Sequence, residues 1–140
     1  MFTAENAEIA EMLKELNKIT ETVICGAMAV HKELGPGLLE SAYEACLAYA
    51  LAECGLAVER QKALPVKYRG VKVDCGYRLD LLVEEKVIVK LKAQNRLEPI
   101  HKAQLLSYLK LFGCKVGLLI NFNIKVLKNG IHRLVFGLQE

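Results

Sequence analysis

The sequence of 140 residues has few prolines, no closely spaced pair of cysteines and no long hydrophobic run. With three prolines, 53% hydrophobic and 25% charged residues, the composition argues against a disordered protein and indicates a globular one. No apolar run approaches the roughly 20 residues of a membrane span, and the acidic N-terminus lacks the apolar core of a signal peptide. We therefore expect a single cytoplasmic domain over residues 1–140, with residues 1–19 as an N-terminal helical extension.

Cysteines are present, but their spacing is not that of a metal site. The five are Cys25, Cys46, Cys54, Cys75 and Cys114, and they form neither a CxxC motif nor a zinc-like spacing with the three histidines. We expect buried free thiols in preference to ligands, and the odd number is typical of a reducing compartment. The net charge of +3 is small, so it permits a nucleic-acid partner without indicating one.

Two stretches near the N-terminus have the spacing of helices. Residues 5–34 place apolar side chains at steps of three and four, with a weak break expected near Thr20. Gly35-Pro36-Gly37 ends this helix, because glycine suits the position after a helix and proline cannot continue one. A second helix is expected over residues 38–54.

The second helix has two candidate faces. Its expected apolar positions are Leu39, Ala42, Cys46, Ala50 and Leu51. A second face, at steps of three and four, carries Glu40, Tyr43, Glu44 and Leu47. We expect Glu44 at least to be solvated.

The middle of the chain predicts three strands. Val58–Tyr68 contains Pro65, which predicts an edge strand or two short pieces. After a turn at Arg69-Gly70, residues 71–83 and 87–92 form a β-hairpin around Glu84–Lys86. Because strand side chains alternate, Lys90 and Lys92 lie on one face and Leu91 on the other. The hairpin brings Asp80 back towards these lysines.

The remaining residues predict one helix and two strands. A helix over residues 97–112 places His101, Gln104 and Tyr108 on one face. These side chains could bind a phosphate backbone or hold a water, or they could cap loops and bond a neighbouring helix. A strand over residues 115–122 follows, then the hairpin signal Asn129-Gly130 and a last strand over residues 131–138. The order of elements predicts an α/β sheet with helices against it.

Five ordered segments together resemble the GxxExxY proteins of the PD-(D/E)XK nuclease superfamily. GLLESAYE matches GxxExxY at Gly37, Glu40 and Tyr43, and YRLDLLVE, VIVKLKA, IHKAQLLSYLK and GLLINF follow in order. The resemblance covers about residues 20–136. It implies a restriction-endonuclease-like fold, with a mixed central sheet flanked by helices, and this agrees with the order of elements above.

The resemblance also implies a catalytic site. Asp80 matches the first acidic residue of the superfamily, and Lys92 matches the lysine of its (Asp/Glu)-x-Lys motif. Glu40 and Gln104 match the helical glutamate and glutamine. The implied cofactor is Mg²⁺ or Mn²⁺, held by Asp80, Glu40 and the backbone carbonyl of Leu91. The implied substrate-binding residues are Lys90, His101, Tyr108 and Tyr43.

The sequence departs from the superfamily at Lys90, which stands at the acidic position of the second motif. An ammonium group offers only donors and a positive charge, whereas a hard divalent cation takes oxygen ligands. Lysine for glutamate changes the charge by two units, each worth on the order of 4 kcal/mol at ~4 Å and an effective dielectric constant of about 20. Three outcomes are open: Glu40 or Glu98 turns inward to supply the missing carboxylate, Lys90 pairs with Asp80 in place of a metal, or Lys90 simply inactivates an otherwise ordinary enzyme.

Two functions follow from this resemblance. The first is metal-dependent hydrolysis of phosphodiester bonds in nucleic acid, with DNA as the expected substrate, impaired by Lys90. The second is a catalytically inactive module on the same fold that binds nucleic acid or protein, with Lys90 and Lys92 holding a phosphate. Many nucleases of this fold act as homodimers, which the exposed edge strand would allow, and we expect no membrane partner.

Overall fold

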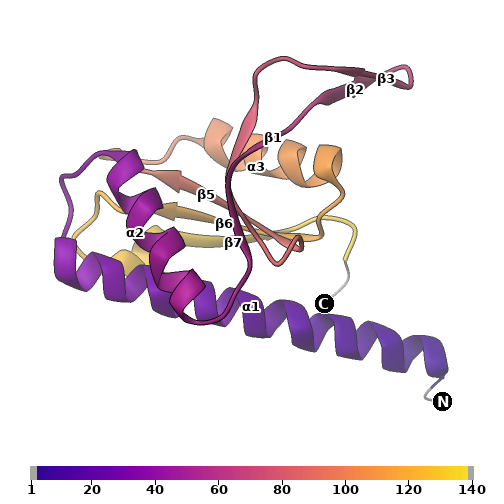
Figure 1. Cartoon of the computed structure of the whole chain (residues 1–140), viewed down its shortest axis with the longest axis horizontal. Helices are drawn as coiled ribbons and strands as arrows, with labels where there is room; N and C mark the ends of the chain where they lie inside the picture. Colours follow the sequence, from indigo (N-terminus) through magenta and orange to yellow (C-terminus); the bar gives the residue numbers. More distant parts are fainter. Residues whose placement is uncertain (1–2, 139–140) are drawn as a thin grey trace.

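The computed structural model describes residues 3–138, so the ends of the predicted 1–140 domain, residues 1–2 and 139–140, lie outside it (Figure 1). Its centre is a mixed sheet in the order β1-β4-β5-β6-β7. Helices α1 (Ala4–Leu34) and α2 (Glu40–Glu53) pack on one face, and α3 (Pro99–Phe112) packs on the other. This arrangement confirms the predicted α/β architecture. Within residues 3–138, no helix is long and apolar enough to cross a membrane.

The sheet contains the predicted hairpin. The strands of the sheet are β1 (Val58–Ala63), β4 (Arg78–Val83), β5 (Val87–Lys92), β6 (Val116–Asn121) and β7 (Ile131–Val135), and β4 and β5 form the hairpin. β4 and β5 are antiparallel, and their pairing runs from Val83 opposite Val87 to Leu81 opposite Val89. β5 and β6 are parallel, with α3 as the crossover between them. Counted from the turn, the last paired residues are Leu81 and Val89, so the two strands separate at Asp80.

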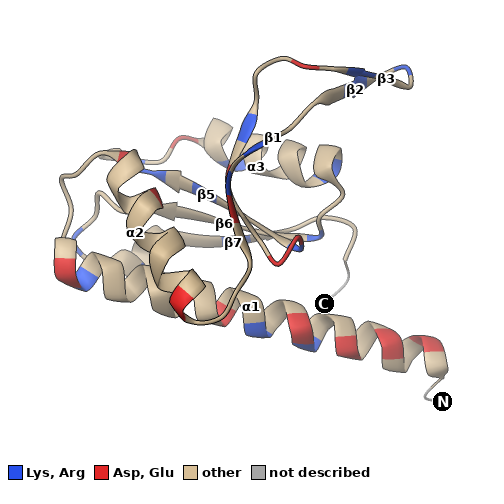
Figure 2. Ribbon diagram, viewed as in Figure 1, with Lys and Arg blue, Asp and Glu red and all other residues tan. Residues whose placement is uncertain are grey.

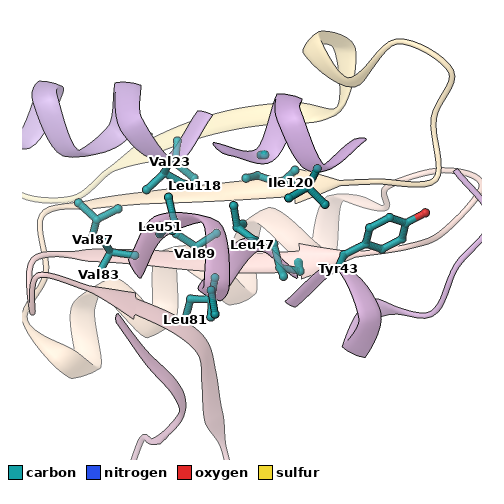
Figure 3. Close-up of a cluster of buried hydrophobic side chains, with 14 of the residues drawn as sticks. Val23, Tyr43, Leu47, Leu51, Leu81, Val83, Val87, Val89, Leu118 and Ile120 are labelled. Atoms are coloured by element: carbon teal, nitrogen blue, oxygen red, sulfur yellow. The ribbon is translucent and has the colours of Figure 1, made fainter. Parts of the chain in front are cut away.

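Strand alternation divides the core into two layers. Leu81 and Val89 point towards α1 and α2, where they join Leu47 in a cluster of buried side chains (Figure 3). Ile88 points to the opposite face and joins Leu105 of α3. Each fully buried aliphatic side chain of this kind contributes about 1.5–3 kcal/mol. The two layers fix α2 and α3 on opposite faces of the same hairpin.

α1 is one continuous helix, so the expected break near Thr20 is wrong. Thr3 caps the N-terminus, whereas the hydroxyl of Thr20 donates to the carbonyl of Asn17 at 3.0 Å inside the helix. A threonine followed by glutamate marks a helix start only where the apolar pattern restarts. Here the pattern of buried side chains runs on from Leu16 to Val23.

The buried face of α2 is the opposite of the expected one. Tyr43 and Leu47 are fully buried, and of the five positions expected to be apolar and buried only Leu51 is. Leu39 is 78% exposed, and Glu44, which we expected in solvent, is only 6% exposed. The helix is apolar around most of its circumference, so spacing alone cannot select the face that packs on the sheet.

Both long strand predictions in the middle of the chain split in two. Residues 58–68 form the edge strand β1 and the short β2 (Val66–Tyr68), and residues 71–83 form β3 (Val71–Val73) and β4. β2 and β3 pair with each other and not with the main sheet. They project from it as a two-stranded ribbon, which we call the arm, residues 66–73 (Figure 1). After β3 the N–H of Gly76 donates to Oδ1 of Asp74 at 2.9 Å, and this turn separates the arm from β4.

Asn129-Gly130 does not form a two-residue turn. The pair ends a short 3₁₀ helix, η1 (Leu127–Gly130), within the longer connection between the antiparallel strands β6 and β7. A side chain at Gly130 would place Cβ 2.5 Å from the carbonyl oxygen of Asn121. Glycine is therefore needed here for close backbone packing.

The cysteines supply the first testable prediction. Cys25, Cys46, Cys54 and Cys75 are exposed, so their expected burial is wrong, whereas Cys114 is buried and burial raises the pKa of its thiol to about 11. Thiolate is the reactive form. A thiol-specific disulfide reagent at mildly alkaline pH should therefore modify four thiols in the folded protein and the fifth only after unfolding. If five thiols react rapidly in the folded protein, or if Cys114→Ala lowers the number of thiols that react rapidly, Cys114 is not buried.

Candidate functional site

The candidate site lies where β4 begins and β5 ends. Beyond the last paired residues of these strands, Oδ2 of Asp80 accepts a hydrogen bond from the backbone N–H of Leu91 at 2.8 Å. This bond takes the place of a ladder hydrogen bond between the strands. It fixes the Asp80 carboxylate between the two strands, close enough to Lys90 on β5 for the two charges to interact.

A pocket of about 320 Å³ opens beside Asp80, and most of its lining side chains carry oxygen atoms. The lining residues are Glu40, Ser41, Glu44, Gln61, Asp80 and Leu91. We call this the acidic pocket. Glu40 stands in the first turn of α2, where the helix dipole favours a negative charge. All three residues implied as metal ligands, Asp80, Glu40 and Leu91, therefore line one pocket.

Three carboxylate side chains, those of Asp80, Glu40 and Glu44, line this pocket. Burial raises the pKa of the Asp80 carboxyl, and the carboxylates of Glu44 and Glu40 raise it further. The N–H of Leu91 and the charge of Lys90 act in the opposite direction without cancelling the effect. Within residues 3–138, no ion pair joins Asp80 to a lysine or arginine. A bound cation would relieve this repulsion.

Glu44 is fixed in the pocket wall by two side chains of β1. Its Oε2 accepts hydrogen bonds from Nε and Nη2 of Arg60 at 3.2 and 3.1 Å, and its Oε1 accepts one from Nε2 of Gln61 at 2.6 Å. These bonds explain why a glutamate is buried on the sheet side of α2. Because both oxygens are engaged, Glu44 ties α2 to the edge strand.

Gln61 is a pocket residue that sequence analysis missed. Its φ of 52° is unusual for a strand residue, and the pairing of β1 with β4 skips it. Arg60 pairs with Leu81 and Lys62 with Leu79, while Gln61 stands opposite Asp80 without a bridge. No spacing pattern marks this residue, because its conformation depends on the packing of α2 against β1.

Lys90 contacts α3 and does not line the acidic pocket. Its Nζ lies 5.0 Å from the centroid of the Tyr108 ring, a cation–π arrangement. Burial lowers the pKa of Lys90, and the charge of Asp80 opposes that effect. The direct ion pair that we considered for Asp80 and Lys90 is not formed within the described chain. The cation at the acidic motif position is thus held against the opposite wall of the site.

The polar residues of α3 have different surroundings. His101 is 8% exposed, and its Nδ1 accepts a hydrogen bond from the backbone N–H of Glu98 at 3.0 Å. His101 thus takes part in the capping of α3, and its predicted substrate contact stays a prediction. Glu98, at the N-cap of α3, does not line the acidic pocket. Gln104 and Tyr108 are half-buried and line a second groove of about 300 Å³.

Tyr43 positions the start of α2. Its side chain is fully buried, so it has no surface for a substrate, and the predicted contact is corrected. The hydroxyl donates to the carbonyl of Gly35 at 2.6 Å and accepts from the N–H of Leu38 at 3.1 Å. The ring stacks on Phe122 with centroids 4.5 Å apart. Tyr43 thus holds the loop that leads into Glu40.

Tyr43→Phe should destabilise the protein by about 1–3 kcal/mol, because two part-buried hydrogen bonds between its hydroxyl and the loop backbone are lost, each worth about 0.5–1.5 kcal/mol. Denaturant unfolding monitored by circular dichroism measures this difference. Tyr49→Phe is the matched control, since Tyr49 on the same helix is 68% exposed and should change stability little. Equal stabilities of Tyr43→Phe and Tyr49→Phe would show that the loop does not depend on this hydroxyl.

The donor set of the acidic pocket suits a hard divalent cation. Asp80 and Glu40 supply carboxylate oxygens, and Leu91 brings backbone to the same pocket. Mg²⁺ keeps several waters and is usually bound through one or two carboxylates. Within residues 3–138, no group of three or more His, Cys, Asp or Glu side chains is placed to hold a metal ion. A cation in this pocket would therefore have to complete its coordination with water.

Comparison with known proteins gives one match. The model of the PD-(D/E)XK nuclease superfamily matches residues 17–134. This span begins inside α1, ends inside β7 and includes both walls of the site. No curated protein and no solved structure matches the chain.

Proposed function

The chain belongs to the PD-(D/E)XK nuclease superfamily, and from this premise we propose that it hydrolyses phosphodiester bonds in DNA with Mg²⁺ or Mn²⁺, at a rate reduced by Lys90. The observation that carries the proposal is that Asp80 and Glu40, from two different elements, line one pocket where β4 and β5 part. Within the superfamily we assign the chain to the GxxExxY proteins, from Gly37, Glu40 and Tyr43.

Each proposed catalytic residue has a distinct task. A bound divalent cation supplies charge neutralisation at the phosphate and a more acidic water. Asp80 and Glu40 would hold that cation at the acidic pocket. Lys92 stabilises negative charge on the phosphate and orients the attacking water. Gln104 donates a hydrogen bond to a phosphate oxygen from the other wall of the site.

The alternative is a catalytically inactive module that binds nucleic acid. It is favoured by one observation, the lysine at the acidic motif position, next to a second lysine on the same strand face. Neither Lys90 nor Lys92 is in an ion pair within residues 3–138. Both ammonium groups are therefore available to a phosphate, and such a module would bind DNA without responding to divalent cations.

Cleavage of labelled single- and double-stranded DNA separates the two functions. We expect the parent to cleave slowly with Mn²⁺ and not with EDTA, and Glu40→Gln to reduce the rate by about 100-fold, since loss of even an outer-shell partner of a metal costs 10–100-fold. Glu53→Gln, at the exposed far end of the same helix, is the control and should leave the rate unchanged. No cleavage with Mn²⁺, together with DNA binding that Mn²⁺ does not alter, would establish the inactive module.

A further inference from the structure

The arm carries a concentrated positive charge. Its sequence, VKYRGVKV, contains Lys67, Arg69 and Lys72 and no acidic residue, so this ribbon of eight residues has a charge of +3 (Figure 2). All three basic side chains are exposed. The charge of the arm equals the net charge of the whole chain, +3, so the other residues together are neutral. The excess charge of the protein is thus located on the arm.

The pairing of the arm brings like charges together. Lys67 stands directly opposite Lys72 in the β2–β3 register. Like charges at directly opposite positions of an antiparallel pair are destabilising. The arm is also only two strands wide, and a two-stranded ribbon is marginally stable by itself. A bound anion between the two lysines would remove the repulsion and stabilise the ribbon.

The other face of the arm is apolar and aromatic. Tyr68 stands opposite Val71, and their side chains are 63% and 62% exposed. The guanidinium of Arg69 lies 5.2 Å from the centroid of the Tyr68 ring, so this ring already presents its face to a cation. Tyr77, at the base of the arm, is 47% exposed. Exposed aromatic rings beside basic side chains are the usual platform for unpaired bases.

The arm is continuous with the candidate site. Val66 of the arm and Tyr77 line the groove of about 300 Å³ whose other wall is Gln104 and Tyr108 of α3. The rings of Tyr77 and Tyr108 lie 6.1 Å apart, and Lys90 lies over the Tyr108 ring. A chain of nucleotides along this groove would run from the arm to the end of β5, where the cleavage site is proposed.

We propose that the arm and the α3 groove bind a single-stranded polynucleotide, with bases on Tyr68 and Tyr77 and with its phosphates reaching Lys67 and Lys72 across the edge of the two-stranded ribbon. Bases in a duplex are already stacked on one another, so exposed tyrosine faces favour an unpaired strand. The inference rests on the proposed function for the position of the bond to be cut. The binding itself requires neither a metal nor cleavage.

Fluorescence anisotropy in EDTA tests this inference with a labelled oligo(dT) of about twelve nucleotides, a length within the usual range of single-strand sites. We expect Tyr68→Ala to weaken binding by roughly 5- to 150-fold, the range for loss of one stacked base. The double variant Lys67→Ala/Lys72→Ala should reduce the slope of log K against log salt by about 1.4, since each phosphate contact on a single strand contributes about 0.7.

Matched controls place the effect on the arm. Tyr49→Ala replaces another exposed tyrosine, on α2, and Lys14→Ala/Lys18→Ala replaces two exposed lysines of α1; both should bind like the parent. The inference would be overturned if the control variants lost as much affinity for oligo(dT) as the arm variants do. It would also be overturned if the parent bound a duplex of the same length more tightly, or did not bind oligo(dT). So would self-association of the parent that Tyr68→Ala abolishes, because a second copy would then cover the arm. Because EDTA prevents metal-dependent cleavage, binding that depends on the arm would stand even if the parent never cleaves DNA with Mn²⁺.

Discussion

Lys90→Glu should bind Mn²⁺ on the order of 100-fold more tightly than the parent and should cleave DNA faster. The substitution removes a positive charge and adds a negative one at the end of β5, next to Asp80. One unit charge at ~4 Å is worth about 4 kcal/mol at an effective dielectric constant of 20, and each 1.4 kcal/mol is tenfold in affinity. We expect less than the full Coulomb energy, because the ammonium of Lys90 lies against Tyr108, and the parent already avoids part of the repulsion.

Titration of Mn²⁺ followed by thermal unfolding measures this difference, since a ligand of the native state stabilises it by RT ln(1 + [L]/Kd). Lys90→Gln separates the two charge steps and should bind Mn²⁺ with an affinity between those of the parent and Lys90→Glu. If Lys90→Glu binds Mn²⁺ no better than the parent, Lys90 does not occupy the acidic position of the motif. Cleavage by both proteins would mean that another carboxylate, with Glu40 as the candidate, replaces the missing one. Cleavage by Lys90→Glu alone would mean that the site is intact and disabled only at Lys90.

Short apolar runs bounded by turns were sufficient to predict the central hairpin. Val87–Val89 and Leu81–Val83 are fully buried or nearly so, and two buried β-branched or aliphatic runs around a charged turn have few other ways to pack. The same local rule failed for residues 71–83, because nothing in an alternating pattern shows where a strand leaves its sheet. The Asx turn at Asp74–Gly76 was the available signal, since aspartate two residues before glycine favours a turn.

The errors on α2 have a different origin. Tyr43 was assigned a substrate contact from the resemblance, and Glu44 was expected in solvent because glutamate is rarely buried. Their partners are Gly35 and Leu38 on one side and Arg60 and Gln61 on the other. The β1 residues lie 16 and 17 positions along the chain from Glu44, so no periodic pattern on the helix contains them. Buried polar groups that are satisfied by distant segments can be found only once the segments are placed together.

The location of Lys90 could be predicted in part. Strand alternation placed Lys90 and Lys92 on the face opposite Leu91, and Leu91 indeed packs in the cluster with α1 and α2. The contact of Lys90 with Tyr108 was not predicted, because it depends on the height and rotation of α3 above the sheet. This contact decides the chemistry of the site, since it holds the extra cation on one wall and leaves the carboxylates on the other.

Asp80→Asn should make the protein more stable and abolish its response to Mn²⁺. Asparagine has nearly the same shape, and its carbonyl oxygen can still accept from the N–H of Leu91. It removes a carboxylate that is partly buried and faces the negative charges of Glu44 and Glu40. Replacement of a strained functional group commonly stabilises a protein by roughly 0.5–2 kcal/mol, because active sites are not optimised for stability.

The pH dependence of stability tests independently whether the Asp80 carboxylate destabilises the folded protein. Because the pKa of Asp80 is raised in the folded state, its ionisation costs stability only as the pH rises above the ordinary value of 3.8. The stability difference between Asp80→Asn and the parent should therefore be present at neutral pH and disappear below pH 3.8. Asp74→Asn is the matched control, since Asp74 is exposed and should affect neither neutral-pH stability nor the Mn²⁺ response. If Mn²⁺ raises the melting temperature of the parent and of Asp80→Asn equally, Asp80 is not a metal ligand. If Asp80→Asn is less stable than the parent at neutral pH, the Asp80 carboxylate stabilises the fold.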